Sequence, residues 1–217
     1  MKKATKFSII IPFKIISQNL LNNLIALEKQ TYKNFEVILI PDDEINLDIS
    51  AYTFDIKVIL SGDINPGQKR DKGSKSAKYE YLAFIDDDAY PPEQWLKVAN
   101  DLFVNNKNIH AIGGPGIDDG GSYFQKLSGK YLRSRIFGFS HRYQKEIEKK
   151  YFDDWPSVNL IISKEKFHEV GGFSNSYWPG EDTVLCSKLK SLNISILYSP
   201  DLYVFHERRV NLYKYLI

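Results

Sequence analysis

Ala83–Trp95, with the sequence AFIDDDAYPPEQW, decides the fold because it places three consecutive acids between an apolar run and two prolines. The apolar residues 81–85 predict a buried strand, and the prolines are typical of the start of a helix. This order puts carboxylates at the carboxyl end of a strand, where open α/β sheets bind their ligands. The three acids are Asp86, Asp87 and Asp88.

Three adjacent ionised carboxylates repel one another, so a nearby cation is the natural compensation. Oxygen ligands of this kind suit Mg²⁺ or Mn²⁺. We therefore hypothesise that a metal ion bridges these carboxylates to a diphosphate. The alternative, on this stretch alone, is that the acids only end the strand and favour a helix N-terminus.

Apolar runs and amphipathic segments alternate on the N-terminal side of the aspartates. Residues 7–13 and 35–40 are apolar runs typical of buried strands, and leucines recur at helical spacing between them. Strand, helix and strand at this spacing predict a βαβ unit with a right-handed crossover. Further strands are expected at 57–60 and 81–85, with a basic helix from about Lys69. The pattern predicts an α/β fold with a doubly wound, mostly parallel sheet and helices on both faces.

The alternation resumes on the C-terminal side, after an irregular segment. A helix is expected at 92–103 and a short strand at 110–114, and residues 116–154 then break the pattern with basic and aromatic side chains. We interpret this segment as an insertion in a single domain, with a weak preference for an acceptor-facing or membrane-facing surface. Later elements are expected at 156–163 (strand), before 171–172 (helix), 181–192 (helix), 194–198 (strand) and 202–205 (strand).

Composition limits the class of protein. The net charge of +2 is too small to argue for nucleic-acid binding, and 217 residues suit one domain. The single cysteine, Cys186, excludes an intramolecular disulfide and a thiolate metal cluster, and we expect it to be buried. The N-terminal apolar run is too short for a signal peptide, and no segment reaches the ~18 uncharged residues that span a bilayer. We therefore expect a cytoplasmic protein, at the inner face of the cell membrane if the basic insertion binds lipid.

Three other stretches carry groups that could act chemically. Asp42 and Asp43 follow the second strand and could accept from a base or a ribose, or could simply form a turn. Lys69 and Arg70 lie near a helix start, where cations and free N–H groups suit a diphosphate, although a solvated basic face looks the same. The third stretch, on the C-terminal side, contains Glu181 and Asp182.

Glu181 and Asp182 follow a Pro-Gly turn at the start of a helix. Acids there complement the helix dipole, and either could also serve as a general base in an enclosed site. His206 ends a late strand and could complete an oxygen-rich metal site, which would favour Mn²⁺, although a lone histidine is more often a packing or surface residue.

Seven stretches in order resemble the family 2 glycosyltransferases with the GT-A fold, and they cover nearly the whole chain. They are FSIIIPF (7–13), EVILIPDD (36–43), PGQKRDKG (66–73), FIDDDAYPPEQWL (84–96), ISKEKFHEVGGF (162–173), WPGEDTVLCSKL (178–189) and LYVFHERR (202–209). The resemblance implies an inverting transfer of sugar from a nucleotide-diphospho-sugar, favouring UDP, to a saccharide or lipid-linked acceptor. Such an enzyme would serve polysaccharide, glycolipid or glycoprotein synthesis, for instance in the cell envelope.

The resemblance also implies roles for residues that match its motifs. Asp182 matches the catalytic base and Glu181 its neighbour, which helps to hold the acceptor. Asp86, Asp88 and His206 match the metal ligands, for Mn²⁺ or Mg²⁺, with Asp87 as the middle acid of the cluster. The residues that match the nucleotide-sugar site are Pro12, Asp42, Asp43, Lys69, Arg70, Asp86 and Asp87, with Asp43 the best candidate for contacting the base. Asp71 departs from the family, which usually has Asn there.

The resemblance divides the chain into a donor-binding half, residues 1–114, and an acceptor-binding half, residues 115–217. Related chains often continue into membrane-associated helices, so we expect this one to be a truncated catalytic domain. Trp155 and Trp178 flank two of the motifs and could stack on sugar rings or pack in the core. The alternatives are a glycoside hydrolase, a sugar nucleotidyltransferase, or a protein that binds nucleotide without turnover.

Overall fold

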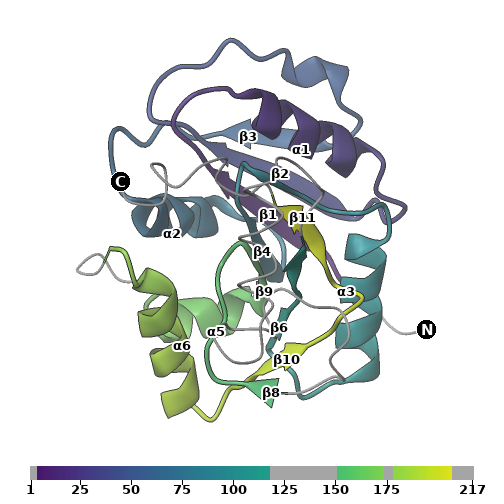
Figure 1. Ribbon diagram of the computed structural model, residues 1–217, viewed down its shortest axis with the longest axis vertical. Coiled ribbons are helices and arrows are strands. Elements are labelled where there is room, and N and C mark those ends of the chain that lie inside the picture. The colour runs from purple at the N-terminus through teal and green to yellow at the C-terminus, as the bar shows by residue number, and fades with distance from the viewer. Residues whose placement is uncertain (1–3, 118–150, 174–177, 207–217) are drawn as a thin grey trace, which may run out of the picture.

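A sheet of eight strands forms the centre of the structure, a computed structural model that describes residues 4–117, 151–173 and 178–206 (Figure 1). The strand order is β3-β2-β1-β4-β9-β6-β10-β8. Strands β1 to β4 are mutually parallel, β9 is antiparallel to both β4 and β6, and β10 is parallel to β6. All but β9 and β8 therefore run in one direction. The bounds are β1 Phe7–Pro12, β2 Phe35–Ile40, β3 Asp55–Val58, β4 Tyr81–Ile85, β6 Ala111–Gly113, β8 Tyr151–Phe152, β9 Asn159–Ser163 and β10 Ile196–Tyr198.

Helices cover both faces of this sheet, as the alternation of elements predicted. On one face, Ile9 and Ile11 of β1 pack with helices α1 (Gln18–Glu28) and α3 (Trp95–Asn105). On the other face, Ile10 belongs to the cluster that includes α5 (Lys164–Glu169) and α6 (Glu181–Ser191). A strand buried on both faces needs an unbroken apolar run, and every residue of β1 is buried. The α/β fold class is confirmed.

Helix α2 (Pro66–Ser76) lies unusually close to the sheet, on the same face as α5 and α6. A Cβ on Gly73 would lie 2.5 Å from Ile40 Cδ1 and 2.8 Å from Ile10 Cγ2, so glycine permits the approach. The helix starts earlier than Lys69 because Asn65 and Gln68 form a capping box around Pro66. The buried face of α2 carries Lys69 and Arg70 instead of large apolar side chains, which puts two cations beneath the carboxyl edge of the sheet.

A second, three-stranded sheet brings the end of the described chain back to the aspartates. Strand β11 (Val204–His206) pairs with β5 (Ala89–Tyr90) and with β7 (Gly116–Ile117). His206 is opposite Ala89 in this pairing. A short 3-10 helix, η1 (Ile49–Ala51), completes the described elements.

The boundaries of several elements differ from the expectations. The third strand is Asp55–Val58, and α3 begins at Trp95 because residues 91–94 form the turn that precedes it. Cys186 is buried, as expected, at 1% exposure. Most of the inserted segment, residues 118–150, lies outside the described residues. None of the helices in the described ranges is long and apolar enough to cross a membrane.

Candidate active site

The carboxyl ends of β1, β2 and β4 meet at one edge of the sheet, because the three strands are parallel and adjacent. Pro12 ends β1, Asp42 is the second residue after β2, and Asp86 follows β4 directly. Residues that are far apart in the sequence therefore reach one place. This is the position that the sequence predicted for a ligand site.

Asp86, Asp88 and His206 form a cluster that could hold a metal ion. One donor atom from each residue lies within 4.8 Å of the other two, and Nε2 of His206 lies 3.2 Å from Oδ1 of Asp88. All three side chains are partly exposed. Two carboxylates and an imidazole suit Mn²⁺, and the carboxylates alone also suit Mg²⁺. The residues present thus fit the divalent cation that the sequence predicted.

Asn23, a buried residue of α1, supports the turn that carries the aspartates. Its Nδ2 donates to the backbone oxygen of Ala89 (2.5 Å) and to that of Asp86 (3.1 Å). Asn23 is not among the site residues predicted from the sequence. The signal available in the sequence was a polar residue between Leu20 and Leu24 in an apolar helical pattern, and the structure shows this residue at 0% exposure.

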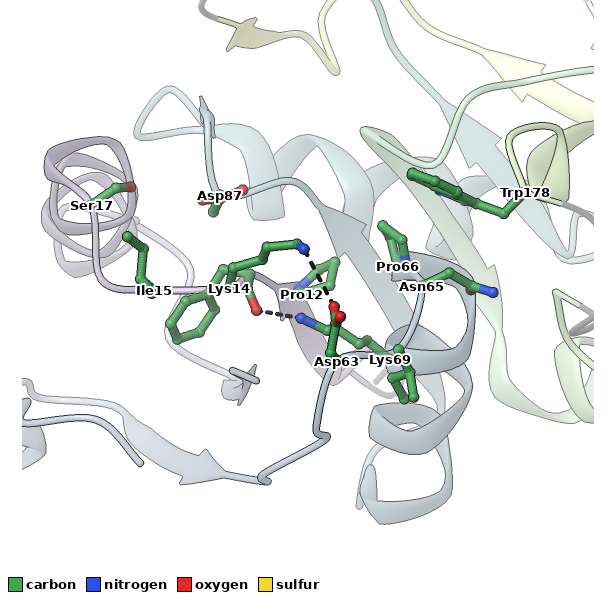
Figure 2. A pocket seen from close by; sticks show the side chains of 12 residues that line it. Pro12, Lys14, Ile15, Ser17, Asp63, Asn65, Pro66, Lys69, Asp87 and Trp178 are labelled. Carbon is green, nitrogen blue, oxygen red and sulfur yellow. Dashed lines mark hydrogen bonds and ion pairs between the residues drawn. The ribbon is translucent and has the colours of Figure 1, made fainter. Parts of the chain in front are cut away.

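A cavity of about 420 Å³ lies beside the aspartates, at the carboxyl end of β1. Figure 2 shows Ile15 and Ser17 on one side of it and Trp178 and Pro66 on the other. Trp178 is 61% exposed, so it is free to stack on a ligand, whereas Trp155 is fully buried and belongs to the core. Of the two alternatives for these tryptophans, core packing is right for Trp155 and wrong for Trp178.

The predicted nucleotide-site residues occupy different positions around this cavity. Pro12, Lys69 and Asp87 line it, with the ammonium of Lys69 donating to the backbone oxygen of Phe13 (2.5 Å). The same ammonium forms an ion pair with Asp42. Asp43 is exposed and does not belong to the lining.

The middle aspartate, Asp87, lines the cavity. Burial, together with the charges of Asp88 and Asp86, raises the pKa of Asp87 to about 6, against the opposing charge of Lys69. A carboxyl group with such a pKa is sensitive to any cation that binds beside it. A bound cation would therefore lower this pKa and stabilise the ionised form.

Arg70 joins the aspartate cluster to the start of α6. Its guanidinium donates to Oδ1 of Asp86 at 2.5 Å through one nitrogen and lies 3.4 Å from Oε1 of Glu181 through another. Burial alone would lower the pKa of Arg70, but Asp86, Asp182 and Glu181 outweigh it and raise that pKa. Arg70 does not line the cavity; it lies behind the site as a charged link between two groups of acids.

Glu181 and Asp182 differ sharply although they are neighbours in the first turn of α6. The carboxylate of Glu181 is occupied, since it contacts Arg70 and accepts from the Gly180 N–H at 3.1 Å. Oδ1 of Asp182 is buried and has no hydrogen-bond partner within the described ranges. Burial raises the pKa of Asp182, against the effects of Arg70 and of Ser157. A partly desolvated carboxylate whose oxygen has no partner among the described residues is suited to accept a proton.

Comparisons with known proteins agree with this geometry. Residues 8–170 match the model of glycosyl transferase family 2. The glycosyltransferase AglE of Haloferax volcanii is 26% identical over 215 residues, which cover 93% of this chain and 67% of AglE. An uncharacterised glycosyltransferase of Haemophilus influenzae is 28% identical over 174 residues, 76% of this chain and 55% of that protein.

A solved structure shares the fold. The crystal structure of GalNAc-T7 with UDP, GalNAc and Mn²⁺ matches with a TM-score of 0.69 and 17% sequence identity, over 95% of this chain and 44% of that one. This chain thus spans between about two fifths and two thirds of the proteins that it resembles.

Proposed function

The chain belongs to glycosyl transferase family 2, and we propose that it moves a sugar from a nucleotide-diphospho-sugar to an acceptor hydroxyl, with inversion at the anomeric carbon. The observation that carries the proposal is the pair of sites linked by Arg70. A cluster suited to a divalent cation lies on one side, and a carboxylate suited to act as a base lies on the other.

Each group then has a chemical task. Asp86, Asp88 and His206 would hold Mn²⁺ or Mg²⁺, and the bound cation would supply positive charge to the diphosphate leaving group. Asp182 would take the proton of the acceptor hydroxyl while the hydroxyl oxygen attacks the anomeric carbon and the nucleoside diphosphate leaves with the bonding electrons. Glu181 would hold the acceptor or fix the start of α6, since Arg70 already engages it.

The donor would occupy the cavity beside Asp87. Its lining comes chiefly from residues 12–17 and 63–69, which supports the division into a donor half, 1–114, and an acceptor half, 115–217. Trp178 is the contribution of the second half, and its exposed ring offers a platform for a sugar ring. UDP is the favoured nucleotide because the structurally similar GalNAc-T7 was crystallised with UDP. The acceptor would be a saccharide or a lipid-linked saccharide, the latter at a membrane surface.

Calorimetry with a donor panel tests the proposal. UDP-, GDP- and dTDP-sugars would each be titrated with Mn²⁺, with Mg²⁺ and with EDTA. We expect one nucleotide class to bind in the presence of metal and to lose binding in Asp88→Ala. Lys97→Met is a matched control, because Lys97 pairs with Asp101 at the surface of α3 and does not line the cavity. Binding that survives in EDTA and in Asp88→Ala would overturn the metal assignment, and no binding across the panel would overturn the donor class.

A further inference from the structure

One peptide group, the bond between Gly172 and Phe173, connects helices α2 and α6. Its N–H donates to Oδ1 of Asp71 on α2 at 3.0 Å. Its carbonyl oxygen accepts from Nζ of Lys188 on α6, also at 3.0 Å. The two ends of one peptide dipole are therefore held by an anion and a cation that come from different helices.

The glycine is required where the peptide group meets Asp71. Gly172 has a φ of +68°, which side chains rarely adopt, and a Cβ there would lie 2.3 Å from Oδ1 of Asp71. The preceding backbone is fixed as well, because the Gly172 N–H donates to the Phe167 oxygen at 3.0 Å at the end of α5. The carboxylate of Asp71 thus approaches the backbone directly.

Phe173 extends the contact to Arg70. Its ring is fully buried and lies 5.4 Å from the Arg70 guanidinium carbon. It also packs edge-on against Phe84 of β4 at a centroid distance of 5.1 Å. Two consecutive residues of α2 therefore contact Phe173: Arg70 contacts its ring and Asp71 accepts from its N–H.

The partners of α2 on α6 lie on a single face of that helix. Glu181 and Lys188 are seven positions apart, which is close to two helical turns. Glu181 contacts Arg70, and Lys188 reaches the peptide group that Asp71 holds. A Cβ on Gly67 would lie 3.1 Å from Cγ of Glu181, so the first turn of α2 is also close. Two attachment points along one face fix the rotation of α6 about its axis.

We propose that Asp71 and Lys188 form a positioning clamp on the Gly172–Phe173 peptide group that fixes α6 and, through it, the direction of Asp182. This inference rests on the proposed function, because it assigns the clamp to the step in which Asp182 acts. Neither Asp71 nor Lys188 lines the donor cavity. The clamp should therefore affect the chemical step and leave the binding of the nucleotide unchanged.

The net effect of its surroundings disfavours the charged form of Asp71. Burial raises the pKa of Asp71, and the Phe173 N–H, Lys188, Lys75 and His168 all act in the opposite direction. An Asn side chain at this position would offer an amide oxygen that accepts the same hydrogen bond. Geometry at the acceptor oxygen should then matter more than the charge.

Five variants test the clamp: Asp71→Ala, Asp71→Asn, Lys188→Met, the double variant Asp71→Ala/Lys188→Met and, as the matched control, Lys190→Met. Lys190 is on the same helix but pairs with Asp153 at the surface. Three quantities would be measured for each: hydrogen exchange of the Phe173 amide in the chain without ligand, the Kd of UDP with Mn²⁺, and the rate of UDP release from the UDP-sugar that binds.

We expect Asp71→Ala to speed exchange of the Phe173 amide at least about tenfold. Asp71→Ala and Lys188→Met should each slow UDP release by about tenfold to a hundredfold, since small misplacements of reacting groups have effects of this size. The double variant should be no slower than the slower single one, because both side chains hold one peptide group. Asp71→Asn and Lys190→Met should stay within about threefold of wild type. The Kd of UDP should change by less than about twofold in all of them.

The inference would be overturned if Asp71→Asn were as slow as Asp71→Ala, or if UDP affinity fell in step with the rate. It would also be overturned if Lys188→Met, whose side chain is only half-buried and whose loss should be tolerated, released UDP as fast as wild type. A wild-type chain that neither binds nor releases UDP would instead refute the proposed function. The amide exchange of Phe173 would still decide whether the clamp exists.

Discussion

Removal of the Arg70 guanidinium should destabilise the protein in a way that depends on pH. Arg70→Met takes away a cation that lies 2.5 Å from Asp86 and 3.4 Å from Glu181, and leaves Glu181, at 8% exposure, without its charged partner. Loss of one partner from a buried ion pair costs about 3–5 kcal/mol of unfolding free energy. Because Asp86 keeps 30% of its side chain in solvent, we expect about 3 kcal/mol near neutral pH.

The sign of the pH dependence follows from linkage. Burial raises the pKa of Asp182 and Arg70 opposes that effect, so without the cation the pKa of Asp182 in the folded variant rises further above that in the unfolded chain. Carboxyl groups with raised folded pKa values lower stability as pH rises, and this penalty disappears below the unfolded pKa, about 4. The deficit of Arg70→Met relative to wild type should therefore be largest at about pH 7.5 and clearly smaller at about pH 5.

Urea unfolding at these two pH values measures the effect, with EDTA present so that no divalent cation replaces the lost charge. Lys14→Met is the control, since it breaks an ion pair between two exposed side chains and should change stability very little. A deficit below about 1 kcal/mol at neutral pH, the range of exposed pairs, would refute the view of Arg70 as a buried electrostatic link. If the loss of unfolding free energy were equal at both pH values, lost packing and not lost charge would be its cause.

Three further predictions concern the reaction. The rate of UDP release at saturating Mn²⁺ should fall about tenfold per pH unit below the raised pKa of Asp182, so the acid limb of the pH–rate profile should lie above the ordinary aspartate range. An acid limb near pH 4 would contradict the burial of this group. Asn23→Ala should weaken Mn²⁺ binding about tenfold to a hundredfold by freeing the aspartate turn, which calorimetry would show; unchanged affinity would mean that the turn holds its shape alone. Trp178→Ala should lower affinity for the UDP-sugar by about 1–2 kcal/mol and leave UDP affinity unchanged, and equal losses for both would place the ring on the nucleotide instead.

Local patterns in the sequence were sufficient to predict the sheet and its helices. The apolar run of β1 is buried on both faces, as predicted. Asp86 directly follows β4, as the apolar run at residues 81–85 indicated. The start of α2 was predicted too late because the capping box of Asn65 and Gln68 lies before the basic run. The third strand was misplaced by two residues, since it alternates between exposed and half-buried positions and has no continuous apolar pattern.

The site was harder to predict because its contacts are long-range. His206 reaches Asp88 through the pairing of β11 with β5, and a pairing between residues so distant in the chain leaves no local signal. Asn23 and Trp178 posed the same difficulty, since one supports the aspartate turn and the other closes the cavity from the opposite half. The family match supports neither the glycoside hydrolase nor the sugar nucleotidyltransferase alternative.

The most direct test compares Asp182→Asn with Asp88→Ala in two assays, Mn²⁺-dependent binding of UDP and release of UDP from the sugar donor. If Asp182 is the base and the metal site lies on the other side of the substrate, Asp182→Asn should still bind UDP, but its rate of UDP release should fall by a factor of about 10²–10⁴. Asp88→Ala should lose binding itself. If Asp182→Asn released UDP at the wild-type rate, the role of Asp182 as the base would be contradicted. If Asp88→Ala bound UDP and Mn²⁺ normally, the role of Asp88 as a metal ligand would be contradicted.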